Sequence, residues 1–332
     1  MKILITAPYH ENGQKVLEQA FGEVVYRPWK DQGRAYTEKE LIQLLQATQA
    51  DALITEHDEV TSQVIRSFPN LQFIGVCRGT PSNVAVEEAS VAGIAVFHTP
   101  ARNAQAVAEM FVSNVICFLR HTIPSMEWLK AGHWNNGAHA SYLQFKGNEM
   151  AGKTIGMVGF GAVGQRIAEM VRCFPCNVVF YDPFVSRFDR SFEKVSLQQV
   201  FSTSDLVSIH LPVNADTMGM IDYSLISLMK RDAIFINTAR AAVVNRNDLL
   251  KALKEKKIRG AILDVYDSEP PDAVDNELIH LPSVFATPHT AGATYEVEDH
   301  HVTIMNDALL NWKNTNLPSA LIVNNEALVA KH

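Results

Sequence analysis

Apolar runs alternate with amphipathic stretches over residues 2–99 of this 332-residue chain. The runs are rich in β-branched and aromatic residues and predict strands, whereas apolar residues recurring at helical spacing predict helices between them. The expected strands are 3–6, 24–26, 52–55, 73–76 and 94–97, and the expected helices lie near 14–21, 38–47 and 62–68. This alternation predicts a parallel sheet covered by helices.

The same alternation resumes at residue 153. Expected strands are 154–158, 178–181, 206–210, 233–237, 261–265 and 284–286, and expected helices are 163–173, 197–201, 223–228, 246–255 and 294–312. Six strands are typical of a doubly wound sheet. Between the two halves, residues 104–120 form a helical pattern that is apolar on more than one side, which favours an oligomer interface over deep core. Residues 128–148 are expected to be a surface excursion.

The length of the chain exceeds that of one ordinary core, so two α/β domains are expected. Net charge is −7 and no long basic run occurs, so neither nucleic acid nor an anionic membrane is an expected partner. The first apolar run is too short for a signal peptide, and no later run would span a bilayer. We therefore expect a cytoplasmic protein.

Four cysteines in a chain of this size do not predict a disulfide framework. Cys173 and Cys176 have the spacing of redox and zinc sites, but no second Cys or His pair completes a metal shell, so no metal is expected. Small apolar residues at a helix end are the favoured interpretation of this pair, and a redox role is the alternative.

The most informative motif is a Gly-x-Gly-x-x-Gly turn between an expected strand and an expected helix. Gly159 allows a sharp turn, Gly161 removes a Cβ that would block a pyrophosphate, and Gly164 lets the helix lie close to the sheet. With Ala162 and Val163, these residues begin the helix, where free N–H groups attract phosphate. The motif predicts a dinucleotide site.

An acid follows at the expected position. Asp182 ends the next strand, 18 residues after Gly164, where a carboxylate accepts hydrogen bonds from the ribose hydroxyls and repels a 2′-phosphate. NAD is therefore the expected cofactor, although the nearby Arg187 leaves some use of NADP open. Further expected cofactor-binding residues follow later strands: His210, Thr217, Thr238 and Gly292.

Three further residues have the chemistry needed to interconvert a 2-hydroxy acid and a 2-oxo acid. His289 suits the transfer of a proton on oxygen, and Glu269 suits the stabilisation of its imidazolium. Arg240 can hold the substrate carboxylate and polarise the adjoining carbonyl. All three follow strand ends, where open α/β sheets bind ligands. Asp264 is expected near the nicotinamide, accepting from its carboxamide.

A turn after residue 76 is a candidate anchor for the substrate carboxylate. Arg78 and Gly79 belong to this turn, which has several exposed N–H groups at a strand's carboxyl end. A plain Gly-Pro turn without a ligand explains the same residues equally well.

Taken together, these motifs make the chain resemble the D-isomer-specific 2-hydroxyacid dehydrogenases, which include phosphoglycerate, glycerate and D-lactate dehydrogenases. The matching segments are 78–79, 99–104, 159–164, 181–183, 237–240, 264–266, 269–270 and 287–292. Departures are Asn83 where an Asp is frequent, Ala241 where a Gly commonly follows the arginine, and Asn245 where an acid is usual.

The resemblance implies two Rossmann-like, doubly wound domains. Residues 1–99 and 297–332 would form a discontinuous, flavodoxin-like substrate domain, with an NAD domain of residues 100–296 inserted. It also implies that Arg240, Glu269 and His289 act on substrate, that Asp182 binds ribose, and that the helix near 104–120 makes a homodimer. The alternative function is an NAD(H)-sensing, corepressor-like binding protein on the same fold.

Overall fold

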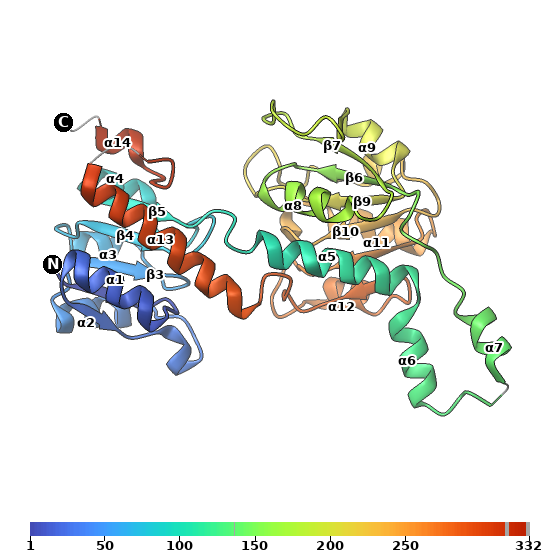
Figure 1. Ribbon diagram of the computed structural model, residues 1–332, viewed down its shortest axis with the longest axis horizontal. Helices are drawn as coiled ribbons and strands as arrows, with labels where there is room; N and C mark the ends of the chain where they lie inside the picture. Colours follow the sequence, from blue (N-terminus) through green and yellow to red (C-terminus); the bar gives the residue numbers. More distant parts are fainter. Residues whose placement is uncertain (136, 316–318, 330–332) are drawn as a thin grey trace. The chain divides into compact units, whose positions relative to one another are not determined.

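The computed structural model describes residues 1–135, 137–315 and 319–329 (Figure 1). Its contacts divide the chain into two compact units. The first unit combines Met1–Asn103 with the segment that begins at Thr294, and the second is Ala104–Ala293. Each unit contains one parallel sheet.

The sheet of the first unit has five parallel strands in the order β2-β1-β3-β4-β5. This is the flavodoxin-like strand order. The strands are β1 (Ile3–Ile5), β2 (Val24–Tyr26), β3 (Ala52–Thr55), β4 (Phe73–Val76) and β5 (Ala95–His98). Every residue of β1, β3 and β4 is buried, as expected where helices cover both faces.

Helices cover the two faces of this sheet with separate cores. The helices are α1 (Glu11–Phe21), α2 (Glu38–Thr48), α3 (Ser62–Ser67), α4 (Val86–Ala92), α13 (Tyr295–Thr315) and α14 (Asn325–Val329). On one face, Leu17 of α1 and Met305 of α13 pack on the sheet. On the other, Leu41 of α2, Val64 of α3 and Ala89 of α4 pack on it. A C-terminal helix therefore completes a core that N-terminal residues begin.

The sheet of the second unit has seven parallel strands in the order β12-β11-β10-β9-β6-β7-β8. They are β6 (Thr154–Val158), β7 (Asn177–Tyr181), β8 (Glu193–Lys194), β9 (Leu206–Ile209), β10 (Ile234–Asn237), β11 (Gly260–Leu263) and β12 (Val284–Ala286). The strand order reverses beside β6, and the chain leaves β6 at the turn that enters α8 (Ala162–Val171). Ligands of doubly wound sheets bind at such a switch point.

Two apolar clusters cover the faces of this second sheet. The covering helices are α5 (Ala104–Leu119), α8, α9 (Leu197–Thr203), α10 (Tyr223–Ile226), α11 (Arg246–Lys254) and α12 (Ala273–Ile279). Phe111 and Val115 of α5 pack with Ile167 of α8 in one cluster. Phe201 of α9 and Leu249 of α11 belong to the other. Both faces of the parallel sheet are therefore buried.

The apolar character of α5 is largely explained within its own unit. Eight of its residues are buried, and no residue of α5 is among the large hydrophobic side chains that are exposed in the described chain. Exposed apolar side chains occur instead on α6 (Thr122–Lys130) and α7 (Gly137–Gln144), which lie away from the sheet in Figure 1. The expected surface excursion thus consists largely of two helices.

The expected α/β fold is confirmed, with one added strand. β8 has two charged, exposed residues and pairs with β7 at the edge of the sheet, so it lacks the apolar pattern that identifies the other strands. Among the described residues, no single helix has the length and apolar composition of a membrane span. Helices α5 and α6 have that length and apolar composition only when they are counted as one segment, and a bend of 61° separates them.

Candidate active site in the second unit

The glycine-rich turn between β6 and α8 has the geometry expected of a phosphate-binding turn. Gly159 has a φ of +90°, and a Cβ there would lie 2.7 Å from the carbonyl oxygen of His210. A Cβ on Gly164 would lie 2.9 Å from the carbonyl oxygen of Gly159. A Cβ on Gly161 would instead meet no atom within 4 Å. Folding thus requires glycine at two positions, whereas at Gly161 the open space suits a ligand.

Asp182 lies beside this turn, at the carboxyl end of β7. Its Oδ2 accepts a hydrogen bond from the N–H of Phe160 at 2.8 Å, within the glycine-rich turn. Its Oδ1 accepts from the N–H groups of Phe184 at 2.9 Å and Val185 at 3.2 Å. These backbone contacts orient the carboxylate next to the N-terminus of α8, where free N–H groups favour phosphate.

Two polar side chains at neighbouring strand ends have buried atoms without a partner among the described residues. They are Nε2 of His210, after β9, and Oγ1 of Thr238, after β10. Burial lowers the pKa of His210 to about 4, so its ring is neutral near neutral pH. Buried polar groups are normally hydrogen-bonded, so both atoms fit a site that a polar ligand completes. With the open space at Gly161, these residues fit a dinucleotide.

The low pKa of His210 predicts that acid destabilises the unliganded protein. Unfolding returns the ring to its ordinary pKa of 6.5, so the unfolded state binds more protons as the pH falls from 6.5 towards 4. Above pH 6.5 the ring is neutral in both states and this group does not change the unfolding free energy. Between pH 6.5 and 4 the unfolded state is protonated first, so the folded protein loses stability over that range. Between pH 7 and pH 5, we expect the unfolding free energy of the wild type to fall by about 2 kcal/mol more than that of His210→Gln.

Urea denaturation of both proteins at the two pH values measures this difference. Equal losses would show that His210 is protonated as easily in the folded state as in the unfolded one.

Thr217 orders the loop after β9. Its hydroxyl donates to the carbonyl oxygen of Pro212 at 2.6 Å and accepts from the N–H of Asn214 at 2.9 Å. Gly292 lies in the segment after β12, one residue beyond the buried Ala291. Both therefore belong to loops at the carboxyl edge of the second sheet.

Arg240 follows β10 on a turn held by a buried asparagine. The side-chain oxygen of Asn237 accepts from the N–H of Ala239 at 3.0 Å, and its amide group donates to the carbonyl oxygen of Arg240 at 3.0 Å. Arg240 itself is exposed, and its Nη1 donates to the carbonyl oxygen of Ala239 at 2.6 Å. A guanidinium at this edge can form a bidentate pair with a carboxylate.

His289 and Glu269 form the expected pair. Nδ1 of His289 lies 2.8 and 2.9 Å from the two carboxylate oxygens of Glu269, and the side chains are 48% and 44% exposed. A carboxylate accepts hydrogen bonds, so Nδ1 is the donor in this contact. Nε2 is then the ring nitrogen that can exchange a proton with a ligand.

Asp264 fixes the segment that carries this histidine. It is fully buried, and Oδ1 accepts from the hydroxyl of Thr287 at 2.5 Å and from the N–H of Thr290 at 2.9 Å. Oδ2 accepts from the N–H of Ala291 at 2.9 Å. Between these contacts His289 has a φ of +53°, which is uncommon outside glycine and persists only where the surroundings hold it.

In the first unit, the turn after β4 is fastened to the end of β5. The carbonyl oxygen of Arg78 accepts from the N–H of Thr99 at 2.9 Å, and that of Gly79 lies 2.8 Å from Nδ1 of His98. The amide group of Asn83 donates to the carbonyl oxygen of Asp58 at 2.8 Å. The turn is thus an ordered feature at the carboxyl edge of the first sheet.

Comparison with known proteins agrees with this geometry. Residues 112–291 match the family model described as D-isomer specific 2-hydroxyacid dehydrogenase, NAD binding domain. The chain belongs to the D-isomer-specific 2-hydroxyacid dehydrogenases. It is 61% identical, over 94% of its length and 91% of the relative's, to the protein of Bacillus subtilis (strain 168) named "Putative 2-hydroxyacid dehydrogenase YoaD".

A more distant relative and a solved structure cover the chain equally well. A glyoxylate reductase of Pyrococcus furiosus is 33% identical over 97% of this chain and 95% of its own length. Among solved structures, the TT0316 protein of Thermus thermophilus has a TM-score of 0.82 and 26% identity, covering 97% of this chain and 100% of that protein. The family resemblance inferred from the motifs is confirmed.

The cysteines of this dehydrogenase have contacts that favour a structural role. All four are free, and the thiols of Cys173 and Cys176 each lie 3.1 Å from a backbone carbonyl oxygen, that of Met170 and that of Met150 respectively. Burial raises the pKa of Cys176, which disfavours the reactive thiolate. No group of three or more candidate metal ligands occurs in the described part of the chain.

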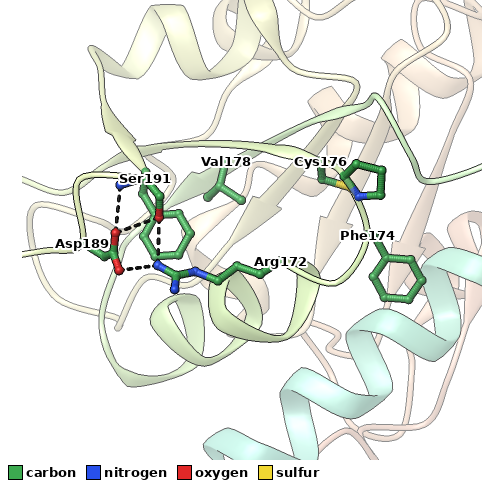
Figure 2. A pocket seen from close by; sticks show the side chains of 8 residues that line it. Arg172, Phe174, Cys176, Val178, Asp189 and Ser191 are labelled. Atoms are coloured by element: carbon green, nitrogen blue, oxygen red, sulfur yellow. Dashed lines mark hydrogen bonds and ion pairs between the residues drawn. The ribbon is translucent and has the colours of Figure 1, made fainter.

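A cavity of about 350 Å³ lies beside Cys176 (Figure 2), and none of its lining residues belongs to the glycine-rich turn. Figure 2 shows Arg172 pointing towards Asp189 and Ser191, and its Nη2 donates to the hydroxyl of Ser191 at 2.8 Å. The guanidinium also lies 4.8 Å from the centre of the Phe192 ring. Since this arginine is engaged by its own neighbours, the cavity carries no assigned anion site.

The sequence interpretation missed several residues that organise the dehydrogenase site. Asn237 holds the turn of Arg240, and the hydroxyl of Tyr266 donates to the carbonyl oxygen of Thr287 at 2.9 Å. Arg246 contacts three carboxylates beside Glu269. Polar residues at strand ends could have drawn attention to Asn237 and Tyr266, but the partners of Arg246 depend on the path of a loop.

Proposed function

We propose that this enzyme transfers a hydride between NAD and C2 of a small D-2-hydroxy acid or 2-oxo acid. The contact between Nδ1 of His289 and the carboxylate of Glu269 carries the proposal. It supplies an oriented acid/base group in the unit that matches the family's NAD-binding domain. We propose that the first unit is the substrate domain.

NAD binds, in this proposal, along the carboxyl edge of the second sheet. Gly159, Gly161, Ala162, Val163 and Gly164 receive the pyrophosphate, and Asp182 binds the ribose hydroxyls. The remaining residues that we place around the cofactor are His210, Thr217, Thr238, Asp264 and Gly292. Asp264 contributes chiefly by fixing the segment of His289, since its contacts in the protein come from that segment.

When bound, NADH supplies the hydride for reduction of a 2-oxo acid. Arg240 holds the substrate carboxylate and polarises the carbonyl. Nε2 of protonated His289 gives a proton to the carbonyl oxygen as it becomes a hydroxyl, and in the reverse direction it takes that proton back. Glu269 orients the ring through Nδ1 and stabilises its positive charge. Arg78 and Gly79 are also proposed to bind the substrate carboxylate.

The substrate class is proposed from named relatives. They include glyoxylate reductases, a hydroxypyruvate reductase of Thermotoga maritima and a D-3-phosphoglycerate dehydrogenase of Methanocaldococcus jannaschii. The test is NADH oxidation, followed by absorbance, with glyoxylate, hydroxypyruvate, pyruvate, 2-oxoglutarate and phosphohydroxypyruvate. We expect turnover of at least one. Tight NADH binding without turnover of any 2-oxo acid, together with a protein partner whose affinity depends on NADH, would favour the corepressor-like alternative.

We also propose that the enzyme is a cytoplasmic homodimer. The proposed interface includes α5, the helix expected to make the dimer, and continues onto α6 and α7, where Leu129 is 52%, Tyr142 68% and Leu143 70% exposed. Large apolar side chains that stay exposed in numbers on one part of a chain are a common feature of association sites. A second copy of the chain is the proposed occupant.

We expect the double variant Leu129→Glu/Leu143→Glu to be monomeric at micromolar concentration, because an interface cannot bury unpaired carboxylates without a large cost. Light scattering after size-exclusion chromatography measures the mass. Leu228→Glu is the control, because this side chain is 43% exposed and lies outside α6 and α7. A monomeric wild type, or a double variant that stays dimeric, would contradict the proposed interface.

A further inference from the structure

Arg246 lies at the centre of a cluster of three carboxylates in the second unit. Its Nε lies 3.0 Å from Asp267, and its Nη1 lies 2.8 Å from Asp272 and 3.1 Å from Asp275. The arginine is the first residue of α11, whereas the three acids belong to the loop after β11 and the start of α12. One side chain therefore ties a helix to a separate loop and to the helix that follows it.

The loop held in this way carries Glu269. Asp267 lies two residues before this glutamate, and Asp272 lies three residues after it. Between them, the N–H of Ser268 donates to Oδ2 of Asp275 at 3.1 Å. Asp272 also caps α12 by accepting from the N–H groups of Val274 and Asp275. The backbone on both sides of Glu269 is thus anchored to Arg246, either directly or through Asp275.

The cluster depends on the arginine for its charge balance. The side chain of Asp275 is only 2% exposed, and those of Asp267 and Asp272 are 33% and 40% exposed. Burial, followed by the nearby carboxylates, raises the pKa of Asp267 in spite of Arg246. Without the guanidinium, three carboxylates would face one another, one of them buried, and unpaired buried charge is strongly unfavourable. Movement of the loop that carries Asp267 away from the start of α12 would relieve that repulsion.

We propose that Arg246 is a positioning residue that holds Glu269 against His289. The inference rests on the proposed function, in which that contact orients the acid/base histidine. Two separate sets of contacts then fix the positions of His289 and Glu269. Asp264 and Tyr266 fix the segment of His289, while Arg246 and Asp275 fix the segment of Glu269.

The two ends of the guanidinium contact different acids. Nε lies nearest to Asp267 and Nη1 lies nearest to Asp272, whereas a lysine has a single ammonium group on a flexible chain. Lysine would restore the charge but would not reach both acids equally well. We therefore expect Arg246→Lys to retain more activity than Arg246→Gln, yet less than the wild type.

The test compares turnover of Arg246→Gln with that of the wild type on the best substrate of the 2-oxo acid panel. We expect kcat to fall by about 10- to 100-fold, the scale of a small displacement of a catalytic group, with the Kd for NADH within about twofold of the wild-type value. In a Glu269→Gln background the same substitution should lower kcat by less than about twofold, because the residue it positions has already lost its carboxylate.

A second ion pair between the same helices provides the matched control. Lys254 of α11 contacts Glu277 of α12, at a distance from the loop of Glu269, and both side chains are about half exposed. Lys254→Gln should leave kcat unchanged. Hydrogen exchange followed by mass spectrometry should show faster exchange at residues 266–271 in Arg246→Gln and wild-type exchange there in Lys254→Gln.

Two results would overturn the inference. One is that Arg246→Gln lowers kcat by the same factor in the Glu269→Gln background as in the wild type, which would show that Arg246 acts on the fold generally. The other is unchanged exchange at residues 266–271. The exchange measurement needs no substrate, so failure of the proposed function, seen as a wild type without turnover, is distinguished from failure of the positioning role. If Arg246→Gln does not fold, Arg246→Lys is measured in both backgrounds.

Discussion

Replacement of His289 by alanine should lower kcat by about 10²- to 10⁴-fold, the usual contribution of a positioned acid/base group. The ring is about half exposed and its Nδ1 is held by Glu269, so its removal takes away the proton donor without opening the core. The Kd for NADH, measured by fluorescence, should stay within about twofold of the wild-type value, since the expected cofactor contacts lie elsewhere.

His280→Ala is the control for this substitution. His280 ends α12 in the same unit, is exposed, and has its Nδ1 2.7 Å from the carbonyl oxygen of Asn276. Its removal should change kcat by less than about twofold, as surface substitutions normally have small effects. Full turnover by His289→Ala would show that another group supplies the proton.

A methyl group at position 161 should weaken NADH binding without loss of stability. A Cβ on Gly161 would meet no protein atom within 4 Å, and its backbone angles, with φ −75° and ψ −159°, are open to any residue. The protein therefore tolerates Gly161→Ala, whereas a pyrophosphate that must approach this backbone would not. We expect Kd for NADH to rise at least about tenfold, or about 1.4 kcal/mol, with an unchanged melting temperature of the unliganded protein.

Gly159→Ala provides the contrast. There the Cβ would lie 2.7 Å from a backbone oxygen and φ is +90°, so both the melting temperature and NADH affinity should fall. Wild-type NADH affinity in Gly161→Ala would place the pyrophosphate away from this turn.

Sequence pattern predicted the sheets well because their strands are local features. The five strands of the first unit and the six longer strands of the second consist mainly of apolar residues and end at turns. β8 was missed because Glu193 and Lys194 pair at an exposed edge, where no apolar pattern is needed. The pattern of α5 correctly indicated burial on several sides, but periodicity cannot distinguish packing on α8 from packing on a second chain.

Sequence spacing was less informative about how the site is held together. The glycine-rich turn and Asp182 follow from local order along the chain, and chemical type together with position after an expected strand selected His289, Glu269 and Arg240. The buried contacts of Asp264 and the three partners of Arg246 join segments that are far apart in sequence or in loops of irregular path. Such contacts depend on the folded backbone, which a pattern of residue types does not determine.

The most direct test of the account is the transfer of deuterium from the cofactor. NADH labelled with deuterium at both hydrogens of C4 is incubated in ordinary water with the enzyme and the best chiral-product substrate of the panel. We expect a D-2-hydroxy acid with one deuterium on C2, detected by mass spectrometry after chiral separation. A product without deuterium, or one of the L configuration, would contradict direct hydride transfer to a D-2-hydroxy acid.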